Sequence, residues 1–326
     1  MRSVRTLTGV AAGFAVVVLA RRIGLAAIAA QLRNLGIVLP IILFTGIVRL
    51  LLQTRAWAIA LRAEGIEISQ WRLIGVRLGS QAAGYLVALG PIVSEPAKVA
   101  LLHNPTGMAA AAPATLFESG AFWFSTMILG LAGACSGAFL VGNSRAVLGA
   151  VAVLGLGLWF LVRRRSLLSP ILQVAGARAP KWLHSAEQTE LQIRSFRDRQ
   201  PEAARKVLAL DSTSQLLTLA EVAAVFWAGG IDFSFFEILA IEAGVRVVKI
   251  LGAWVPGRIG TDEGGSAASF ALLGFSPAAG LMLAVARRVR DILWCVVGIM
   301  WTAASHTAIP ASTPRATQPA LCIEEH

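Results

Sequence analysis

An apolar stretch near the C-terminal end, broken by glycine, proline and acid, constrains the fold of this chain more than any other feature. Residues 254–291 have the apolar content of a membrane helix, but seven residues interrupt them: Pro256, Gly257, Gly260, Asp262, Glu263, Gly264 and Gly265. Irregular backbone and acidic groups inside a membrane segment are costly, so they occur where protein or a water-filled cavity surrounds them. The stretch therefore predicts a functional site, with an ordinary solvated loop as the alternative. The segment LGPIVSEPAK at 89–98 repeats the scheme with Glu95 and Lys98, which favours the site.

The composition restricts the class of protein. Of the 326 residues, 56% are hydrophobic and 14% are charged, and the mean hydropathy is +0.70. A soluble domain carries about 25% charged residues, so we predict an all-α integral membrane protein that crosses the membrane several times. Much of the net charge of +11 lies in short connections beside apolar runs. This indicates positive-inside orientation and contact with anionic phospholipids, and not binding to nucleic acid.

Cysteine and histidine offer no framework for a disulfide or a metal ion. The chain has three cysteines and four histidines, and they lie far apart in the sequence. Their spacing matches neither a disulfide scaffold nor a zinc site. We therefore expect no metal and no cofactor.

The apolar runs predict a series of membrane helices. The run at 7–20 is predicted to be a retained first helix, with a cleaved signal peptide as the alternative, and 23–36 suits a helix in the membrane interface. Further spans are expected at 37–61, 75–90, from Glu118 to 140, 145–162, 207–229, 233–255 and 292–309. In the span 37–61, Arg49 and Gln53 share a helix face. They either point into the bundle, or the span ends near Leu52 and its arginines snorkel to the head groups.

One polar segment divides the transmembrane domain, 1–309, into halves 1–162 and 207–309. This segment, 163–206, holds ten Lys and Arg against four acids. A basic connection of this length is predicted to lie in the cytoplasm, as one or two amphipathic helices on the membrane surface. The tail, 310–326, is rich in Pro, Ser and Thr and is predicted to be disordered.

The two halves show the same order of features. Pairs of similar residues recur at a nearly constant separation in the sequence: Pro91 with Pro256, Glu95 with Glu263, and Trp123 with Trp294. In many transporters, broken helices in corresponding positions of two inverted repeats meet near the membrane midplane and form the substrate site. We therefore predict two inverted-repeat-like halves, with re-entrant helical hairpins at 91–112 and 256–286.

Charged side chains mark a polar seam next to the break. Glu242, Arg246 and Lys249 follow the spacing i, i+4 and i+7, which places them on one helix face toward the interior. The carboxylate of Glu263 needs a cation or water, because an isolated ion in hydrocarbon costs several kcal/mol at least. Folding back the apolar segment after Glu263 would return arginines to its level, and the nearest in sequence are Arg258, Arg287 and Arg288.

Several of these segments resemble the flippase-like transmembrane family named after lysylphosphatidylglycerol synthase, over about residues 7–308. The resemblance lies in PIVSEPAKVALL, in LFES, and in VPGRIGTDEGG followed by LLGFSPAAGLMLAVARRVRDILWCVVG. It implies a protein of the inner (cytoplasmic) membrane with about eight helices that moves or handles polar lipids. The site positions that it implies are Glu95, Glu118, Glu263, Arg287 and Arg288. The soluble aminoacyl-transfer domain of the bifunctional synthases has no counterpart in these residues, so we do not expect a lysyltransferase.

The function that these observations favour is lipid translocation. A polar head group cannot cross roughly 30 Å of hydrocarbon alone, so the protein must offer complementary charges. A phosphate would be held by the cations Arg246, Lys249, Arg258, Arg287 and Arg288, and a cationic group or a coupled proton by Glu95, Asp262 and Glu263. Transport also suggests a lipid-modifying enzyme as a partner. The alternatives are a membrane-embedded transferase or hydrolase acting on a lipid-linked substrate, for which the sequence offers no nucleophile motif, and a non-catalytic accessory subunit of an envelope lipid pathway.

The basic segment gives a prediction about orientation. A Ser185→Cys variant should resist thiol labelling from outside intact cells, because its surroundings carry the largest basic excess of the chain and so stay in the cytoplasm. Labelling after permeabilisation checks that the cysteine is reactive. Efficient labelling of intact cells would reverse the predicted orientation.

Overall fold

The computed structural model of the protein describes residues 36–87, 90–102, 108–142, 149 and 181–307. Every regular element in these ranges is helical, in agreement with the predicted all-α class. The predicted helix at 7–20, nearly all of those at 23–36 and 145–162, and the tail at 310–326 lie outside the described residues.

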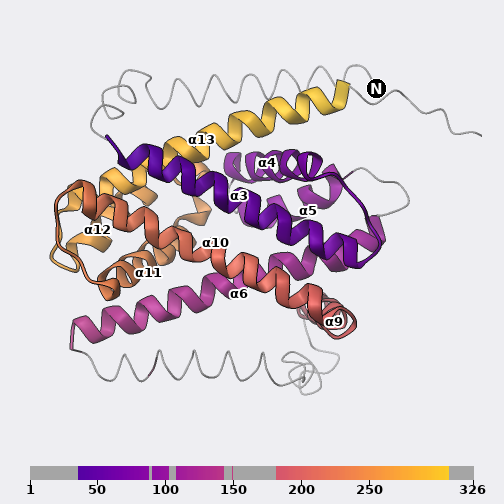
Figure 1. Ribbon diagram of the computed structural model, residues 1–326, viewed down its shortest axis with the longest axis horizontal. Helices are drawn as coiled ribbons and strands as arrows, with labels where there is room; N and C mark the ends of the chain where they lie inside the picture. Colours follow the sequence, from indigo (N-terminus) through magenta and orange to yellow (C-terminus); the bar gives the residue numbers. More distant parts are fainter. Residues whose placement is uncertain (1–35, 88–89, 103–107, 143–148, 150–180, 308–326) are drawn as a thin grey trace, which may run out of the picture.

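The described helices form two sets of four, separated by α9 (Figure 1). The first set comprises α3 (Val38–Ala63), α4 (Gln70–Leu86), α5 (Gly90–Leu101) and α6 (Met108–Leu140). After α9 (Lys181–Arg199), the second set comprises α10 (Pro201–Ala228), α11 (Phe235–Leu251), α12 (Thr261–Ala271) and α13 (Pro277–Thr307), with two short 3₁₀ turns between α11 and α12, η2 (Gly252–Trp254) and η3 (Pro256–Arg258). The helix lengths follow the same order in both sets: 26, 17, 12 and 33 residues, then 28, 17, 11 and 31.

The first helices of the two sets, α3 and α10, pack against each other in antiparallel directions. Along α3, Arg49 contacts Glu221 of α10 and Gln53 contacts Ser214, so the contacts run forward on one helix and backward on the other. The two helices cross the centre of the bundle in Figure 1. Two further extensive contacts join the two sets, α6 against α11 and α4 against α13. The first helices of the two sets thus run in opposite directions, and an inverted repeat of the whole set stays a prediction.

Glycines allow the closest of these helix contacts. A Cβ atom on Gly133 of α6 would overlap the backbone carbonyl oxygen of Leu239 on α11, and one on Gly298 of α13 would overlap that of Leu78 on α4. Each glycine lies at a contact between a helix of the first set and a helix of the second. Small residues let helix backbones approach without side chains between them, as in membrane bundles.

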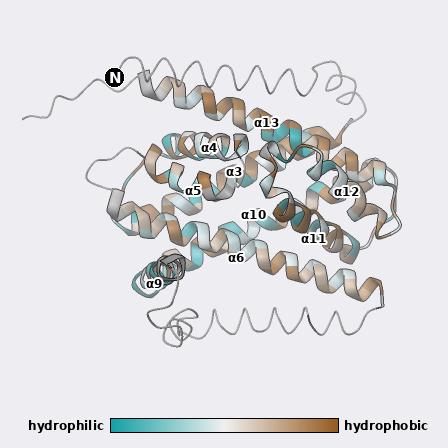
Figure 2. Ribbon diagram, turned by 180° about the vertical axis from the view of Figure 1, so that it is seen from behind, coloured by the Kyte–Doolittle hydropathy of each residue, from teal (hydrophilic) through white to brown (hydrophobic). Residues whose placement is uncertain are grey.

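The bundle has an apolar exterior and charges inside. Leu272 is 83% exposed, and Phe44, Trp227 and Leu251 are also exposed, whereas Glu221 on α10 is fully buried. Figure 2 shows hydrophilic residues in the middle of α13, where a soluble bundle would place apolar ones. This arrangement is typical of helices in lipid. Among the described residues, two helices are long and apolar enough to cross a membrane, Val38–Ala63 and Ala111–Leu140. The expected total of about eight spans stays a prediction.

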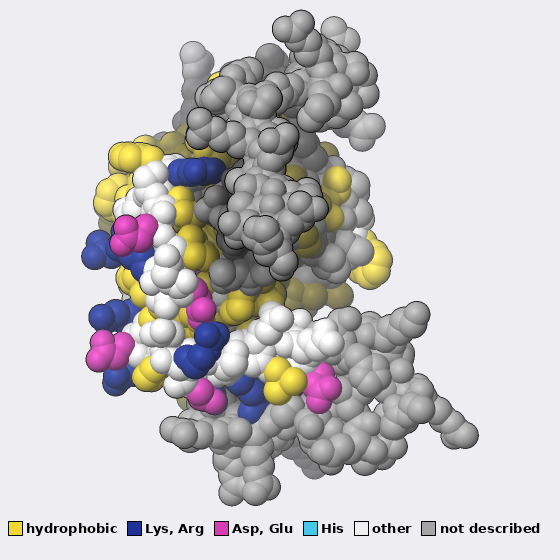
Figure 3. Space-filling model, turned by 90° about the vertical axis from the view of Figure 1, so that its right-hand side faces the viewer, with side chains coloured by type: hydrophobic (Ala, Val, Ile, Leu, Met, Phe, Trp, Pro, Cys, Tyr) yellow, Lys and Arg dark blue, Asp and Glu magenta, His cyan; other side chains and the backbone are white. Residues whose placement is uncertain are grey.

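A polar end lies where α9 joins the bundle. Arg199, at the end of α9, pairs with Glu64, just past the end of α3, and the ring of Phe196 on α9 packs against that of Phe117 on α6. Figure 3 shows acidic and basic side chains together on this face. The described part of the basic segment is therefore one helix docked on the bundle, plus the first turn of α10. Its cytoplasmic location stays a prediction.

Several predicted boundaries were wrong. Glu118 does not open a helix, because α6 begins ten residues earlier at Met108 and tolerates Pro113 in its second turn. The last helix begins at Pro277 and not near 292, since its charged residues find partners inside the bundle and need not end a span. The predicted hairpins are each a short helix, α5 or α12, followed by the start of the next long helix. Whether they enter the membrane and return stays a prediction.

The glycine contacts give a stability prediction. Gly133→Ala should lower the free energy of unfolding by about 1–3 kcal/mol, because the new methyl group forces α6 away from α11. Gly264→Ala is the matched control, since a Cβ there meets nothing within 4 Å and alanine is the better helix former. Thermal unfolding in detergent measures both variants. Equal melting temperatures would mean that the α6 and α11 backbones are not in close contact.

Candidate functional site

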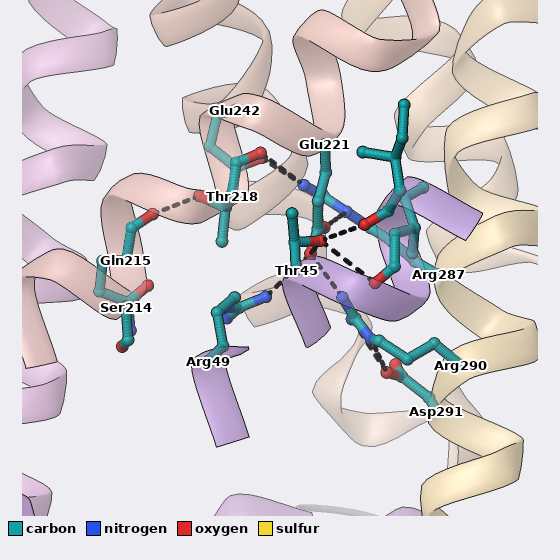
Figure 4. Close-up of polar contacts among 12 residues, drawn as sticks. Thr45, Arg49, Ser214, Gln215, Thr218, Glu221, Glu242, Arg287, Arg290 and Asp291 are labelled. Carbon is teal, nitrogen blue, oxygen red and sulfur yellow. Dashed lines mark hydrogen bonds and ion pairs between the residues drawn. The ribbon is translucent and has the colours of Figure 1, made fainter. Parts of the chain in front are cut away.

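A buried carboxylate on α10 holds the charges at the centre of the bundle together. Glu221 accepts from Arg287 Nε at 2.6 Å and from Arg290 Nη1 at 2.7 Å, both on α13, and from Arg49 Nη1 on α3 at 3.3 Å. Thr45 of α3 also donates to it. Figure 4 shows these groups converging on Glu221 from α3 and α13. Gly46 leaves room for Arg290 to cross α3, because a Cβ there would meet its side chain.

A second buried carboxylate, on α11, extends this centre. Glu242 accepts from Arg287 Nη2 at 2.9 Å and lies 3.2 Å from Arg246 of its own helix. Arg246 in turn donates to Gln215 at 3.0 Å and to Thr218 at 3.1 Å, both on α10. We call these residues the central cluster: Thr45, Arg49, Gln215, Thr218, Glu221, Glu242, Arg246, Arg287 and Arg290.

The central cluster has more donors than its own acceptors satisfy. Its four arginines face three carboxylates, those of Glu221, Glu242 and the adjoining Asp291, which leaves one net positive charge. Four buried side-chain nitrogens of the central cluster have no hydrogen-bond partner among the described residues: Arg49 Nε, Gln215 Nε2, Arg246 Nε and Arg287 Nη1. No carboxylate or hydroxyl oxygen of the cluster is in that state within the described chain. Buried polar groups normally find partners, so the cluster is suited to a ligand with several acceptor oxygens.

The break after α11 places a second group of charges beside the first. Gly257, Arg258 and Gly260 have φ of 63°, 49° and 83°, a left-handed conformation that glycine adopts without strain. The chain thereby reverses and starts α12, whose first turn carries Asp262 and Glu263. Acids in a first helical turn are favoured by the helix dipole.

Glu263 joins the break to α13. Its carboxylate accepts from the backbone N–H of Gly260 at 2.9 Å and forms a two-point ion pair with Arg288, at 2.8 Å and 3.0 Å. Arg258 lies 3.4 Å from Asp262 and 3.8 Å from Asp291. We call these residues the break cluster: Arg258, Asp262, Glu263, Arg288 and Asp291. Because Asp291 also pairs with Arg290 at 3.0 Å, the break cluster and the central cluster are continuous.

The first helix set carries a third group, the first-half cluster: Arg77, Glu95, Lys98, Glu118 and Ser119. Arg77 of α4 pairs with Glu118 of α6, and Ser119 donates to Glu95 of α5. Lys98 lies 2.9 Å from Glu95 and 3.5 Å from Glu118. Two cations and two acids therefore balance in this cluster.

Corresponding positions of the two helix sets make corresponding contacts. The pair of Arg77 with Glu118, between α4 and α6, matches that of Glu242 with Arg287, between α11 and α13, and the two pairs have opposite polarity. The contact between Ser119 and Glu95 likewise matches that between Arg288 and Glu263, because each joins the short helix of its set to the long one that follows. The two sets thus have polar contacts at the same positions, but the charges of the contacting side chains differ.

The structure gathers the sequence-predicted residues into these three clusters. Glu95, Lys98 and Glu118 lie in the first-half cluster, Arg246 and Arg287 in the central cluster, and Arg258, Asp262, Glu263 and Arg288 in the break cluster. Lys249, one turn after Arg246, lies within electrostatic reach of Glu242 and Asp291. The expected fold-back does bring an arginine to Glu263.

Two expected partners of Glu263 were wrong. Arg287 binds Glu221 and Glu242 instead, because consecutive residues on a helix face about 100° apart. Arg258 pairs with Asp262 and Asp291. Of the two alternatives for the span 37–61, the interior one holds, since Arg49 reaches Glu221 and Gln53 is buried against Ser214.

Sequence reasoning missed the residue at the centre. Glu221, Arg77 and Arg290 are not among the residues that the sequence predicts for the site. The available signal was the rule that an ionisable residue in the middle of an apolar helix faces the interior and has a partner. Among the described residues, no cluster of His, Cys, Asp and Glu is suited to a metal ion.

Comparison with known proteins agrees with the resemblance seen in the sequence. A family model described as the lysylphosphatidylglycerol synthase TM region matches residues 6–298. No curated protein and no solved structure matches the chain.

Glu221 is more deeply buried than Glu263, so their substitutions should affect stability differently. Glu221→Gln should lower the free energy of unfolding by about 3–5 kcal/mol, because it leaves buried arginines without their counter-charge. Glu263→Gln should cost about 1 kcal/mol or less, because that pair is partly exposed and glutamine still accepts from Gly260. Melting temperatures in detergent compare the two. A larger loss for Glu263→Gln than for Glu221→Gln would contradict this assignment of the central charge.

Proposed function

The chain belongs to the lysylphosphatidylglycerol synthase transmembrane family, and from this premise we propose that it transports a polar lipid across the membrane, holding the phosphate of the head group in the central cluster. It does so as a multi-pass protein of the inner membrane. The observation that carries the proposal is the set of four unpaired buried donors around Glu221 and Glu242.

A phosphate diester fits this set of donors. It brings acceptor oxygens and a negative charge, and arginine forks bind it through two parallel hydrogen bonds. Arg287 offers its free Nη1 next to the Nε and Nη2 that already hold carboxylates. A phosphate bound there would offset the net positive charge of the cluster. Neutral sugars or hydroxyls would leave that charge uncompensated.

The cluster also reaches the surface of the bundle at two places. The side chain of Arg49 on α3 is 18% exposed and that of Arg246 on α11 is 11% exposed, while Glu221 between them is fully buried. At Arg49 or at Arg246, a phosphate can therefore replace the carboxylate that the arginine binds, and then move inward toward Glu221. Such an exchange avoids an unpaired charge, whose cost in a low dielectric would otherwise block the path.

The antiparallel packing of α3 against α10, the first helices of the two sets, supports transport over simple binding. We take the sets as the inverted repeats predicted from the halves 1–162 and 207–309, with α5 and α12 as the short broken helices. In transporters of this type, one repeat moves against the other around a site near the midplane. The central cluster draws on α3 from the first set and on α10, α11 and α13 from the second, so such a movement would change it directly.

The proposal predicts a selective loss of transport. Arg246→Gln removes the positive charge at one of the two places where the central cluster reaches the surface. Translocation of a fluorescent phospholipid between the leaflets of proteoliposomes should therefore slow tenfold or more, which corresponds to a barrier raised by about 1.4 kcal/mol. Arg199→Gln is the matched control, because Arg199 is an exposed arginine outside the clusters. Wild-type transport by a correctly folded Arg246→Gln protein would remove the central cluster from the path.

A further inference from the structure

Asp211 is a buried acid outside the three clusters described above. It lies on α10 and is fully buried, yet neither of its carboxylate oxygens has a hydrogen-bond partner among the residues that the structure describes. The buried carboxylates of Glu118, Glu221 and Glu242 differ, since each has at least one arginine at bonding distance. Asp211 is therefore an acid without a counter-ion.

Its surroundings supply no spare positive charge. The charged groups that act on Asp211 electrostatically are Glu118 of α6, Arg77 of α4 and Lys98 of α5. Both cations are already paired, Arg77 with Glu118, and Lys98 with Glu95 and Glu118. The first-half cluster is balanced without Asp211, so an ionised Asp211 would add an uncompensated negative charge to a buried site.

The matching position in the other helix set shows how this site differs. When α3 and α10 are aligned so that Gln53 corresponds to Gln215, Arg49 corresponds to Asp211. Arg49 has a carboxylate partner in Glu221, whereas Asp211 has no cation. An isolated buried carboxylate is so costly that the group takes up a proton instead.

We propose that Asp211 binds the exchangeable proton that couples lipid transport to a proton gradient. The acid is protonated while it is enclosed between the two helix sets. When the sets move and open it to water, the O–H bond breaks, the proton goes to water and the carboxylate remains, to be protonated again from the other side. The coupling rests on the proposed transport function, but the proton site rests on burial and the missing partner alone.

Infrared spectroscopy of the protein in lipid tests the proton site independently of transport. The chain contains five aspartates. In wild-type protein labelled with ¹³C at the side-chain carboxyl of aspartate, the infrared carboxyl bands of these five residues shift and those of the glutamates do not. Of the other four, Asp198, Asp262 and Asp291 have an arginine partner, and Asp232 is exposed. One protonated acid carbonyl band at neutral pH, shifted by the label and by D₂O, is therefore expected from Asp211.

Two variants assign the band. Asp211→Asn should remove it, and Asp232→Asn should leave it unchanged. If Asp211→Asn does not fold, the labelled wild type still decides the question. A wild-type spectrum in which all aspartates are ionised overturns the proton site, and so does ionisation of the acid on addition of Na⁺ at constant pH, because that would assign the site to a metal cation.

A transport measurement tests the coupling. In proteoliposomes, the rate for wild type and for Asp232→Asn should change with the direction of an imposed pH gradient, and Asp211→Asn should lose this response. A gradient response retained by Asp211→Asn overturns the coupling. If the wild type moves no lipid, the proposed transport function fails and the coupling with it, while the infrared band still decides whether Asp211 binds a proton.

Discussion

The arrangement of this bundle depends on one buried carboxylate with several arginine partners. Glu221 could not lie in the interior of an apolar bundle as a lone ion, because the desolvation cost would be several kcal/mol. Arg287 and Arg290 of α13 and Arg49 of α3 offset that cost. Each of these contacts joins helices that are far apart in the sequence. The charge at Glu221 therefore determines the relative positions of α3, α10 and α13. In a membrane, apolar side chains gain little free energy by contacting each other instead of lipid.

The same contacts connect the fold with the proposed function. An interior held by ion pairs can exchange one partner for a ligand of the same charge without leaving an unpaired ion, and this exchange is what a moving phosphate requires. The central cluster has donors to spare, since Arg287 and Arg246 each retain an unpaired buried nitrogen. The first-half cluster is balanced, and next to it lies the unpaired acid Asp211. The two sides of the bundle are thus suited to different ions, an anion near Glu221 and a proton near Asp211.

The parts of the site that could be predicted from the sequence are those set by local spacing. The pair of Glu242 with Arg246 follows from one helical turn, and the contact of Glu263 with Arg288 follows from folding back a short apolar segment. The partners of Glu221 could not be predicted in this way. Arg287 lies 66 residues from Glu221 and Arg49 lies 172 residues away, so their meeting depends on the packing of the two helix sets. Helix starts were also misplaced, because charged residues that find partners inside the bundle do not mark the ends of spans.

The central claim is that the cluster around Glu221 holds the phosphate of a lipid. The most direct measurement is a structure of the protein in lipid nanodiscs, determined by electron cryomicroscopy at a resolution that shows head groups. The account predicts a phosphate within hydrogen-bonding distance of Arg287 Nη1 or Arg246 Nε, with its acyl chains leaving the bundle beside α3 or α11. Lipids bound only on the outer surface, with these arginine nitrogens contacting water or protein alone, would contradict it.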